Sequence, residues 1–385
     1  MGRRINKERL TRVLYFSQDY TPHDFRFVNS LAESGQDVLY GRLECNGSVE
    51  RRPLPAGVRM VDLTQDTPGK SRKAYEHRVV ARLKELVNEF QPDVVHAGPL
   101  PGPAFLAARA GLHPLVSMSW GSDLLLETRR SLRAAWRAFI ALRHSDWLVG
   151  DCLAVRDRAA QLGFPSKRTT LFPWGIDLQK FTPGDENELR VSWRWEKQFV
   201  LLSLRAWEPI YGVEDILQAF ARARRFIPEL RLLLLGKGSQ EERIHQLLRE
   251  LDLHEFVRMD GNIPNDELVR YYRACDLYVS ASHSDGSSVS LMEALACGKP
   301  VVVSDIPGNR EWVDGTGVGW MFRDGSETEL AEKLQASVRQ TERLTAMSFA
   351  ARRLAEERAD WSKNFPHLLT AYSSAIERAH RRKTA

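Results

Sequence analysis

The sequence has no long hydrophobic run. Its richest apolar stretch is LRLLLLG at residues 230–236, far shorter than the roughly 18 apolar residues of a membrane-spanning helix. The amino terminus, MGRRINKERL, is basic, but the apolar part that follows it is too short for a signal peptide. We therefore expect no membrane span and a chain that begins here and works in the cytosol.

Cysteine is scarce and widely spaced. The close cysteine pairs of zinc and redox sites are absent, so we expect the thiols to be reduced and structural. The four residues are Cys45, Cys152, Cys275 and Cys297.

Length and charge are more informative. A chain of 385 residues is long for one domain and sufficient for two. Residues 1–180 hold 27 Lys and Arg against 19 Asp and Glu, whereas the remainder holds 28 against 31. This asymmetry indicates that the first half meets something anionic, such as lipid headgroups, a phosphorylated molecule or nucleic acid. Nucleic acid is the weakest of these, because the basic residues are scattered and no stacking platform is evident.

Short apolar runs alternate with helical patterns along the whole chain. This rhythm predicts βαβ units with mainly parallel sheets, as in two Rossmann-like α/β domains. The runs are RVLYFS, DVLYG, DVVHAG, PLVSMSW and DWLVG in the first half, and FVLLSLR, LRLLLLG, FVRMDG, DLYVSAS and PVVVSD in the second.

A polar, Pro- and Gly-rich stretch at residues 173–190 interrupts this pattern and predicts a hinge. We expect domains at 1–178 and 179–360, facing each other across a cleft where ligands bind beyond the carboxyl ends of the strands. Helical spacing from Glu327 to His380 predicts two or three amphipathic helices. The last helix, 361–385, could cross back to the first domain.

Residues 280–308, SASHSDGSSVSLMEALACGKPVVVSDIPG, carry the most chemistry. A strand ends in a polar loop, and a helix begins near Ser287 or Ser288. The N–H groups from Gly286 to Val289 and the positive helix end would bind a diphosphate. Glu293, further along that helix, can accept hydrogen bonds from a ribose diol. The alternative is that Ser287 and Ser288 only cap the helix.

This stretch resembles the signature of the family-four retaining glycosyltransferases, which have the GT-B fold. The resemblance implies that Glu293 binds the donor ribose, that Asp285 faces the donor sugar, and that the amides of Ser287, Ser288, Val289 and Ser290 bind the diphosphate. Asp285 stands where the family usually has Glu. The matching residues are Asp285, Gly286, Glu293, Ala294, Cys297, Gly298, Pro300, Val301 and Val302.

Other segments of the second domain share the resemblance. In SLRAWEPIYGVEDILQAF, Arg205 matches a phosphate-binding Arg, although a surface ion pair is the alternative for it. Tyr211 replaces the usual Lys, and either Lys237 or Lys299 could supply the missing charge. The DGNIP segment places Gly261, Asn262 and Ile263 near the donor base, and LFPWGIDLQKF resembles the interdomain segment, with Gly175 and Asp177 retained.

The first domain departs more from the family. Its first loop, QDYTPHDFRF, lacks the usual glycines and instead offers Asp19, His23 and Asp24 at a strand's carboxyl end. The usual His-Gly-x-Asp segment has Trp120 in place of its His, so a proton-relay role would pass to Asp123 or His96. For His96, a structural histidine is an equal alternative.

The resemblance implies a retaining transfer by front-face substitution, in which the departing phosphate oxygen helps to deprotonate the incoming hydroxyl. The protein then mainly orients the substrates and stabilises the leaving diphosphate. The sequence has no Asp-x-Asp metal motif and no hydrolase-type acid/base pair. We expect a metal-independent enzyme with no cofactor and a UDP- or GDP-sugar as cosubstrate. The expected catalytic residues are Arg205, Asp285, Glu293, His96 and Asp123.

Glycan, polysaccharide or glycolipid biosynthesis is the expected setting. The segment LLLETRRSLRAAWRAFIALRHSD interleaves apolar residues with Arg129, Arg130, Arg133, Arg137 and Arg143. It could rest on an anionic membrane at the inner face of the bilayer and receive a lipid-linked acceptor, or be an ordinary packed helix. A catalytically silent nucleotide-sugar-binding protein is the main alternative function, and a sugar-nucleotide epimerase a more distant one.

Overall fold

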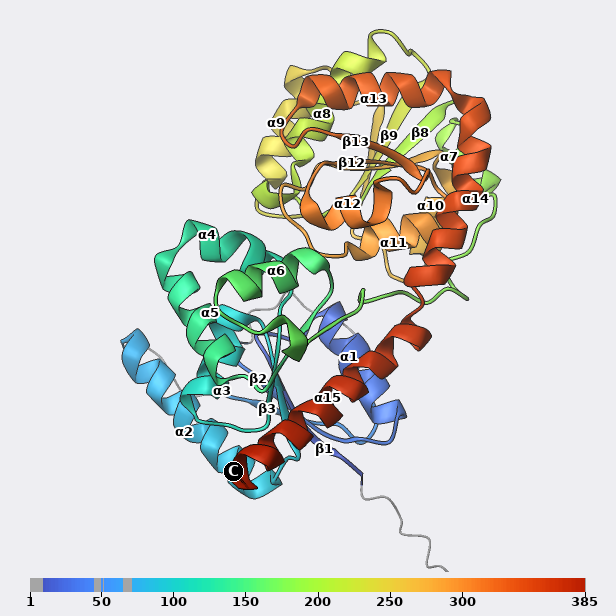
Figure 1. Ribbon diagram of the computed structural model, residues 1–385. Helices are drawn as coiled ribbons and strands as arrows, with labels where there is room; N and C mark the ends of the chain where they lie inside the picture. Colours follow the sequence, from blue (N-terminus) through green and yellow to red (C-terminus); the bar gives the residue numbers. More distant parts are fainter. Residues whose placement is uncertain (1–9, 45–49, 51, 65–70, 385) are drawn as a thin grey trace, which may run out of the picture. The chain divides into compact units, whose positions relative to one another are not determined.

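The computed structural model describes residues 10–44, 50, 52–64 and 71–384, so Cys45 lies outside the described residues. The chain forms two compact units (Figure 1). Unit 1 ends at Phe172 and resumes at Phe365, and unit 2 holds residues 173–364 together with 152–154. These boundaries lie close to the predicted ones at 178 and 361, and residues 365–385 return to unit 1.

Unit 1 is built on a seven-stranded sheet in the order β3-β2-β1-β4-β5-β6-β7. Every neighbouring pair of strands is parallel. The parallel sheet predicted for the first domain is confirmed. The strands are β1 (Arg12–Ser17), β2 (Asp37–Arg42), β3 (Arg59–Asp62), β4 (Val94–Ala97), β5 (Leu115–Met118), β6 (Trp147–Gly150) and β7 (Thr169–Leu171).

Helices cover both faces of this sheet. Figure 1 shows α1 and α15 on one side and α2, α3 and α5 on the other. The helical segments are α1 (Pro22–Glu33), α2 (Arg72–Phe90), η1 (Leu100–Ala104), α3 (Phe105–Arg109), η2 (Asp123–Glu127), α4 (Thr128–Arg130), α5 (Leu132–His144), α6 (Leu153–Gln161), η3 (Ser166–Arg168) and α15 (Trp361–Thr384).

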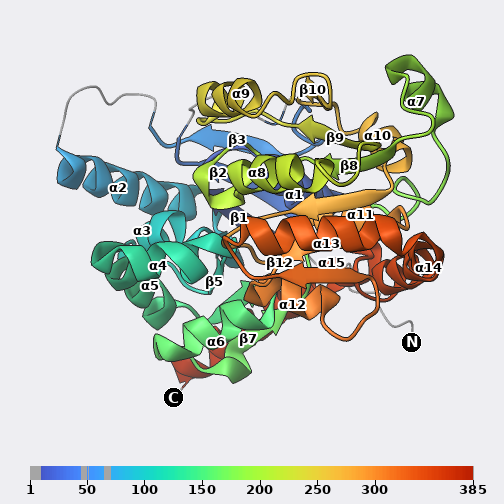
Figure 2. The same ribbon diagram turned by 90° about the horizontal axis from the view of Figure 1, so that it is seen from above.

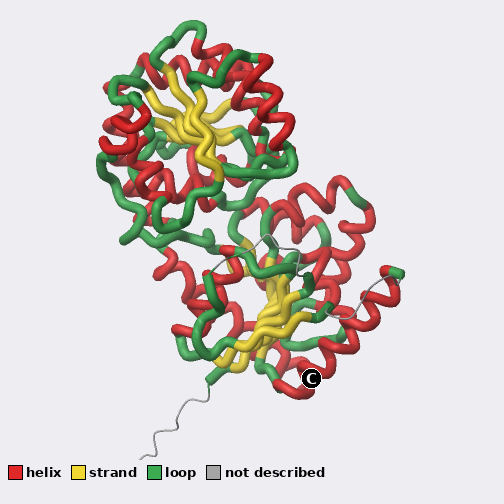
Figure 3. The backbone as a smooth tube through the Cα atoms, turned by 180° about the vertical axis from the view of Figure 1, so that it is seen from behind, coloured by secondary structure: helices red, strands yellow, loops and turns green. Residues whose placement is uncertain are grey.

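Unit 2 has a six-stranded sheet in the order β10-β9-β8-β11-β12-β13, and its neighbouring strands are also all parallel. Figure 3 shows the strands of each unit gathered into one sheet with helices around it. The strands are β8 (Phe199–Ser203), β9 (Leu230–Leu235), β10 (Val257–Gly261), β11 (Leu277–Ser280), β12 (Val301–Ser304) and β13 (Gly319–Phe322).

Both faces of the second sheet are buried. Leu233 and Leu235 of β9 belong to one hydrophobic cluster, and Leu232 and Leu234 belong to the other. A strand covered on both sides reads as a continuous apolar run, which is why β9 has the sequence LRLLLL. Figure 2 shows α8 beside α13 over this sheet. The helical segments are α7 (Asn187–Trp193), η4 (Pro209–Tyr211), α8 (Val213–Arg224), α9 (Glu241–Glu250), α10 (Leu268–Ala274), α11 (Val289–Ala296), α12 (Pro307–Val313), α13 (Glu327–Arg339) and α14 (Thr341–Arg358).

Every strand predicted from an apolar run is present, but β3, β7 and β13 were not predicted. All three are edge strands of their sheets. Each is only three or four residues long, and none is fully buried along its length. An edge strand needs fewer apolar side chains, so its pattern in the sequence is weak. The three helices α13, α14 and α15 confirm the amphipathic segment predicted at the carboxyl end.

The predicted hinge contains a tight backbone contact. Ile176 N donates to Ala359 O at 2.7 Å, and Trp361 N donates to Ile176 O at 3.1 Å. Gly175 has φ +66°, and a Cβ there would lie 2.9 Å from the Trp361 backbone. Only glycine fits this position. The segment that enters unit 2 and the segment that leaves it are therefore paired with each other.

Cys152, Cys275 and Cys297 are buried, as expected of structural thiols, and form no disulfide with one another. Burial raises the pKa of the Cys275 and Cys297 thiols to about 12, which makes both unreactive near neutral pH. Within the described part of the chain, no helix is long and apolar enough to cross a membrane.

The carboxyl-terminal part of α15 completes the core of unit 1. Leu368, Ala371, Tyr372 and Ala375 are buried at helical spacing. The Tyr372 hydroxyl lies 2.7 Å from His96 Nδ1 on β4. This hydrogen bond joins two elements that are 276 residues apart in the sequence.

We predict that Tyr372→Phe lowers the free energy of unfolding of unit 1 by about 1–3 kcal/mol, because it leaves a buried imidazole nitrogen without its partner. Urea unfolding would measure the change. Tyr271→Phe is the matched control, since its partly buried hydroxyl makes a 3.3 Å contact with Asp260. Equal stability of the Tyr372 variant and the wild type would contradict this account.

Candidate functional site

Polar and charged side chains gather at the carboxyl ends of β8 and β11. These two strands are hydrogen-bonded neighbours, so the segments that follow them meet at one edge of the sheet. Arg205 lies two residues after the end of β8, and Asp285 lies in the loop between β11 and α11. This edge is where open parallel sheets bind ligands.

Arg205 is the centre of this cluster. Its Nη2 lies 2.7 Å from Asp285 Oδ2, and its Nη1 donates to Ser288 Oγ at 2.9 Å and to Ser290 Oγ at 3.3 Å. Burial is the largest single influence and opposes the charge of the guanidinium, but Asp285 together with Tyr211, Tyr278 and Tyr272 outweighs it and raises the pKa of Arg205. The site therefore keeps a permanent cation next to the start of α11. The surface ion pair that was the alternative for Arg205 is not observed.

Tyr211 lies against Arg205. The guanidinium carbon stands 4.1 Å from the centre of the Tyr211 ring, a cation–π geometry. The position where the family usually has a second cation thus holds a neutral side chain that orients the first one. Of the two lysines proposed to compensate, Lys299 cannot do so. It precedes β12 and donates to the backbone carbonyls of Arg273 and Cys275, at the opposite edge of the sheet.

Residues of α12 contact the loop before α11 and fix its position. Trp312 Nε1 donates to Ser287 Oγ at 3.3 Å, and a Cβ at Gly308 would lie 2.3 Å from Gly286 O. Ser288 is the N-cap residue of α11, but its side chain makes no capping hydrogen bond. The capping alternative for Ser288 is therefore wrong, because its hydroxyl accepts from Arg205 instead.

Glu293 lies one helical turn beyond Val289 and is buried. Tyr272 of α10 donates to Glu293 Oε2 at 2.8 Å, and burial and the Glu293 charge raise the pKa of this phenol well above its usual value. Tyr278 of β11 lies 2.8 Å from Ser290 Oγ. The sequence analysis missed both tyrosines, because each lies in an apolar stretch whose pattern is typical of core residues.

The remaining donor-side candidates follow neighbouring strands. Lys237 comes after β9, and Asn262 and Ile263 come after β10. Lys237 is exposed and its side chain lies beside Gly261, with Cε 3.5 Å from where a Cβ would be. Ile263 packs on the hydrophobic core of unit 2. These residues share the edge of the sheet with Arg205.

The candidates of unit 1 do not form one group. His96 is fully buried, its ring packs against Tyr15, Phe27 and Tyr372, and burial lowers its pKa to about 3. It is a neutral core residue, as the structural alternative proposed, and its side chain is not open to a substrate. A catalytic role for His96 has no support in this placement.

Asp123 holds two loops together. Its carboxylate accepts from Ser119 Oγ at 2.6 Å, Trp120 N at 3.0 Å and Leu100 N at 2.9 Å. These bonds tie the segment after β5 to the segment after β4. Trp120 itself packs edge-on against His23, with 5.1 Å between the ring centres. Asp123 thus supports the Trp120 loop.

The other two acidic candidates face inward. Asp24 forms a capping box with Thr21 and accepts from Tyr15 Oη at 3.1 Å, and burial raises its pKa to about 6. Asp19 accepts from Tyr20 N and lies 3.7 Å from Arg42 Nη1. The rings of His23 and Trp120 lie together. The described residues contain no group of three or more His, Cys, Asp or Glu side chains suited to a metal ion.

Two family models match this chain. Residues 185–354 match the model described as "Glycosyl transferases group 1", and residues 12–148 match "Glycosyl transferase 4-like". The chain belongs to the group 1 glycosyltransferases. The resemblance seen in the sequence is confirmed.

This group 1 glycosyltransferase is similar in sequence to enzymes whose names state an activity. A D-inositol 3-phosphate glycosyltransferase of Geodermatophilus obscurus is 31% identical over 57% of this chain and 51% of its own length. A GDP-mannose-dependent alpha-(1-6)-phosphatidylinositol monomannoside mannosyltransferase of Mycolicibacterium smegmatis is 26% identical over 74% of this chain and 78% of its own. The chain spans about half the length of the first of these relatives.

Solved structures share the fold. Anabaena HepE in complex with UDP-glucose superposes with a TM-score of 0.81 at 21% identity, over 94% of this chain and 99% of HepE. Sucrose-phosphate synthase from Thermosynechococcus elongatus gives 0.78 at 18% identity, over 95% of this chain and 99% of the synthase. The fold of this group 1 glycosyltransferase is therefore GT-B, as expected.

We predict that Asp24 makes unit 1 more stable in mild acid. Its folded-state pKa of about 6 exceeds the ordinary value of 3.8, so the folded state binds the proton more tightly, and stability falls as the pH rises from about 4 to about 6. The loss is on the order of 2–3 kcal/mol.

Urea unfolding at several pH values between 4 and 7 would measure this loss in the wild type and in Asp24→Asn. The variant should lack this part of the pH dependence, because an amide does not titrate. Asp157→Asn, at an exposed position of α6, is the matched control. Parallel pH profiles for the wild type and Asp24→Asn would disprove the assignment.

Proposed function

We propose that this protein transfers a sugar from a nucleotide-sugar donor to an acceptor hydroxyl, in the biosynthesis of a glycan, polysaccharide or glycolipid. The observation that carries the proposal is the convergence of Arg205, Asp285 and the start of α11 at the carboxyl edge of the second sheet. A buried cation beside a helix amino terminus suits a diphosphate. Family membership and the names of the relatives support the same activity.

Different residues at this edge of the sheet would bind the diphosphate, the ribose and the base of the donor. Arg205 and the backbone N–H groups at the start of α11 would bind the diphosphate. Glu293, held by Tyr272, would accept hydrogen bonds from the ribose diol. Asn262 and Ile263 would lie near the base, and Lys237 would add a second positive charge. HepE was solved with UDP-glucose, and the mannosyltransferase is named for GDP-mannose, so UDP- and GDP-sugars are our first candidates.

We further propose a retaining, metal-independent reaction that needs no cofactor. Negative charge develops on the diphosphate as the bond to the sugar breaks, and Arg205 is placed to stabilise that charge. Asp285, which holds Arg205 in the absence of a donor, would face the sugar. This mechanism needs no strong base, and His96, which the sequence analysis proposed for a proton-relay role, is buried and neutral in the core of unit 1.

A catalytically silent nucleotide-sugar-binding protein is the second candidate. Tyr211 and Trp120 favour it, because each replaces a side chain that carries charge or protons in the family. Sugar transfer or donor hydrolysis distinguishes the two: binding without either reaction would favour the silent protein. An epimerase would convert the donor sugar without an acceptor.

The α4–α5 region supports peripheral contact with an anionic membrane at the inner face of the bilayer. Leu132, Trp136 and Phe139 lie on one face of α5 and are 92%, 57% and 40% exposed. Exposed Arg129 and Arg130 precede them. This combination suits a surface rich in anionic lipids. Arg137 does not contribute, because it is buried and paired with Glu76.

We predict that Glu293→Gln weakens donor binding about 10- to 100-fold, because it removes charge-assisted hydrogen bonds to the ribose. A ligand-observed NMR and thermal-shift screen against UDP-, GDP-, ADP- and CMP-sugars would first identify the base, and calorimetry would measure the change. Glu332→Gln, on an exposed face of α13, is the matched control. Unchanged affinity in a folded Glu293 variant would exclude the proposed ribose contact.

We predict that Trp136→Ser with Phe139→Ser reduces recovery of the protein with floating anionic liposomes several-fold, because the apolar anchor is lost. Neutral liposomes should recover little protein. Phe349→Ser is the control, since Phe349 of unit 2 is 75% exposed but lies far along the chain from α5. A wild-type protein that does not float with anionic liposomes would rule the contact out.

A further inference from the structure

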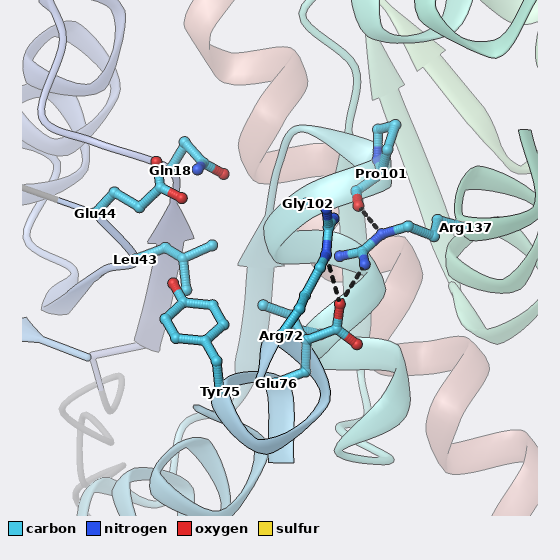
Figure 4. A pocket seen from close by; sticks show the side chains of 10 residues that line it. Gln18, Leu43, Glu44, Arg72, Tyr75, Glu76, Pro101, Gly102 and Arg137 are labelled. Atoms are coloured by element: carbon cyan, nitrogen blue, oxygen red, sulfur yellow. Dashed lines mark hydrogen bonds and ion pairs between the residues drawn. The ribbon is translucent and has the colours of Figure 1, made fainter. Parts of the chain in front are cut away.

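Unit 1 contains a cavity of about 440 Å³, within the range of small-molecule sites, ~300–1,000 Å³. Figure 4 shows that two walls form it. Gln18, Leu43 and Glu44 line one wall, and Arg72, Glu76 and Arg137 line the other, with Tyr75 at one end. None of the site residues predicted from the sequence, other than Arg137, belongs to it.

The cavity lies where the fold predicts a ligand. The chain builds β1, β2 and β3 in one direction and then places β4 on the other side of β1. A crevice opens at such a switch in strand order, beyond the carboxyl ends of the two strands. Gln18 follows the last residue of β1, and Gly102 lies in η1, shortly after β4. A Cβ at Gly102 would lie 3.0 Å from Gln18 Oε1, which shows that the two segments are close together.

One wall has an excess of positive charge. Glu76 Oε1 lies 2.6 Å from Arg137 Nη1 and 3.4 Å from Arg72 Nε, and Glu76 Oε2 lies 2.9 Å from Arg109 Nη1. A fourth guanidinium, that of Arg133, lies 3.9 Å away. Arg72 and Arg137 line the cavity, whereas Arg109 and Arg133 do not line it but add positive charge within 4 Å of Glu76. One carboxylate cannot neutralise four guanidinium groups. The wall therefore suits an anion.

Several donors of this wall are available to a ligand. The Arg72 side chain is 61% exposed, and its contact with Glu76 is long. Arg137 is fixed through Nε, which donates to Pro101 O, and through Nη1, and Figure 4 shows its remaining nitrogen directed toward Arg72 and Gly102. The Tyr75 hydroxyl is buried and has no hydrogen-bond partner among the described residues.

We propose that this cavity binds the acceptor and that the acceptor is a phosphorylated sugar or polyol. Its phosphate would lie between Arg72, Arg137 and Tyr75, and its hydroxyl groups would face Gln18 and Glu44. Donors that approach from two helices fit a tetrahedral group with at least three acceptor oxygens better than a planar carboxylate, which a single arginine can bind. The inference rests on the proposed transferase function, since it assigns the acceptor of that reaction.

Within this site, Glu76 is a positioning residue. It holds Arg137 and Arg72 on the cavity wall, and the arginines in turn lower its pKa although burial opposes this. Glu76 therefore stays ionised, and it repels an anion less than an isolated carboxylate would. The opposite wall supplies the Gln18 amide and the Glu44 carboxylate but no cation, which suits the hydroxyl end of the acceptor.

The test uses the full chain and four probes: glucose 6-phosphate, myo-inositol 1-phosphate, unphosphorylated glucose and inorganic phosphate. Ligand-observed NMR and calorimetry at millimolar concentration should detect at least one of the two phosphorylated probes, and glucose at least tenfold more weakly. Arg72→Gln should weaken binding of that probe about tenfold and Tyr75→Phe several-fold. Arg59→Gln, which changes an exposed arginine of the same unit at the amino-terminal end of β3, should have no effect.

Three outcomes would overturn the proposal: glucose binding as tightly as the phosphorylated probes, no binding of either phosphorylated probe, or unchanged affinity in Arg72→Gln. Binding of inorganic phosphate that is insensitive to Arg72→Gln would also overturn it, as an adventitious ion only. A thermal unfolding curve checks that each variant is folded.

Donor binding, measured in the same samples, separates this proposal from the proposed function. Arg72→Gln should leave the affinity for the nucleotide sugar unchanged, because Arg72 belongs to unit 1 and the donor residues belong to unit 2. If the donor binds and phosphorylated probes do not, only the acceptor assignment fails. If no nucleotide sugar binds while a phosphorylated probe does, the transferase function fails and the cavity remains an anion site.

Discussion

The ion pair between Arg205 and Asp285 joins the end of β8 to the loop after β11, and the arrangement of side chains at the start of α11, where we propose that the donor binds, depends on it. Through the same guanidinium, Ser288 and Ser290 are fixed at the start of α11. The pair is possible because β8 and β11 are parallel neighbours whose carboxyl ends meet. A charge buried at this point would be unfavourable alone, and Asp285 compensates for it until an anionic ligand can share it.

The two units use arginine in different ways. In unit 2, Arg205 is paired with one carboxylate and lies against the Tyr211 ring, so its orientation is closely defined. In unit 1, four arginines surround Glu76 and exceed it in charge. The positive excess that the sequence shows in its first half thus has a local origin in the structure. It lies partly beside a cavity and partly on the exposed α4–α5 region.

Several residues that stand out in the sequence have structural roles. Asp123 joins two loops, Asp24 completes the capping box of α1, and His96 packs in the core against Tyr372 of α15. Each follows or approaches the carboxyl end of a strand, which made it a reasonable candidate. A position at the end of a strand places a residue at the carboxyl edge of the sheet, where ligands bind. The direction of its side chain, however, depends on what packs against it. Lys299 cannot supply the second positive charge for a simpler reason. It precedes β12 and therefore lies at the opposite edge of the sheet from Arg205.

The sequence by itself determined the alternation of strands and helices, the two parallel sheets and which residues of unit 2 are candidates for the donor site. Asp285, Gly286, Ser288 and Glu293 are close in sequence and lie on one strand–loop–helix unit, so their spacing fixes their geometry. Only the tertiary structure decided what depends on contacts between distant segments. The Tyr272 hydroxyl reaches Glu293 from another helix, Tyr372 reaches His96 from the far end of the chain, and the edge strands form because a neighbouring strand supplies their hydrogen bonds. The Glu76 cluster likewise combines α2, α3 and α5, whose separate sequences give no sign that their charges meet.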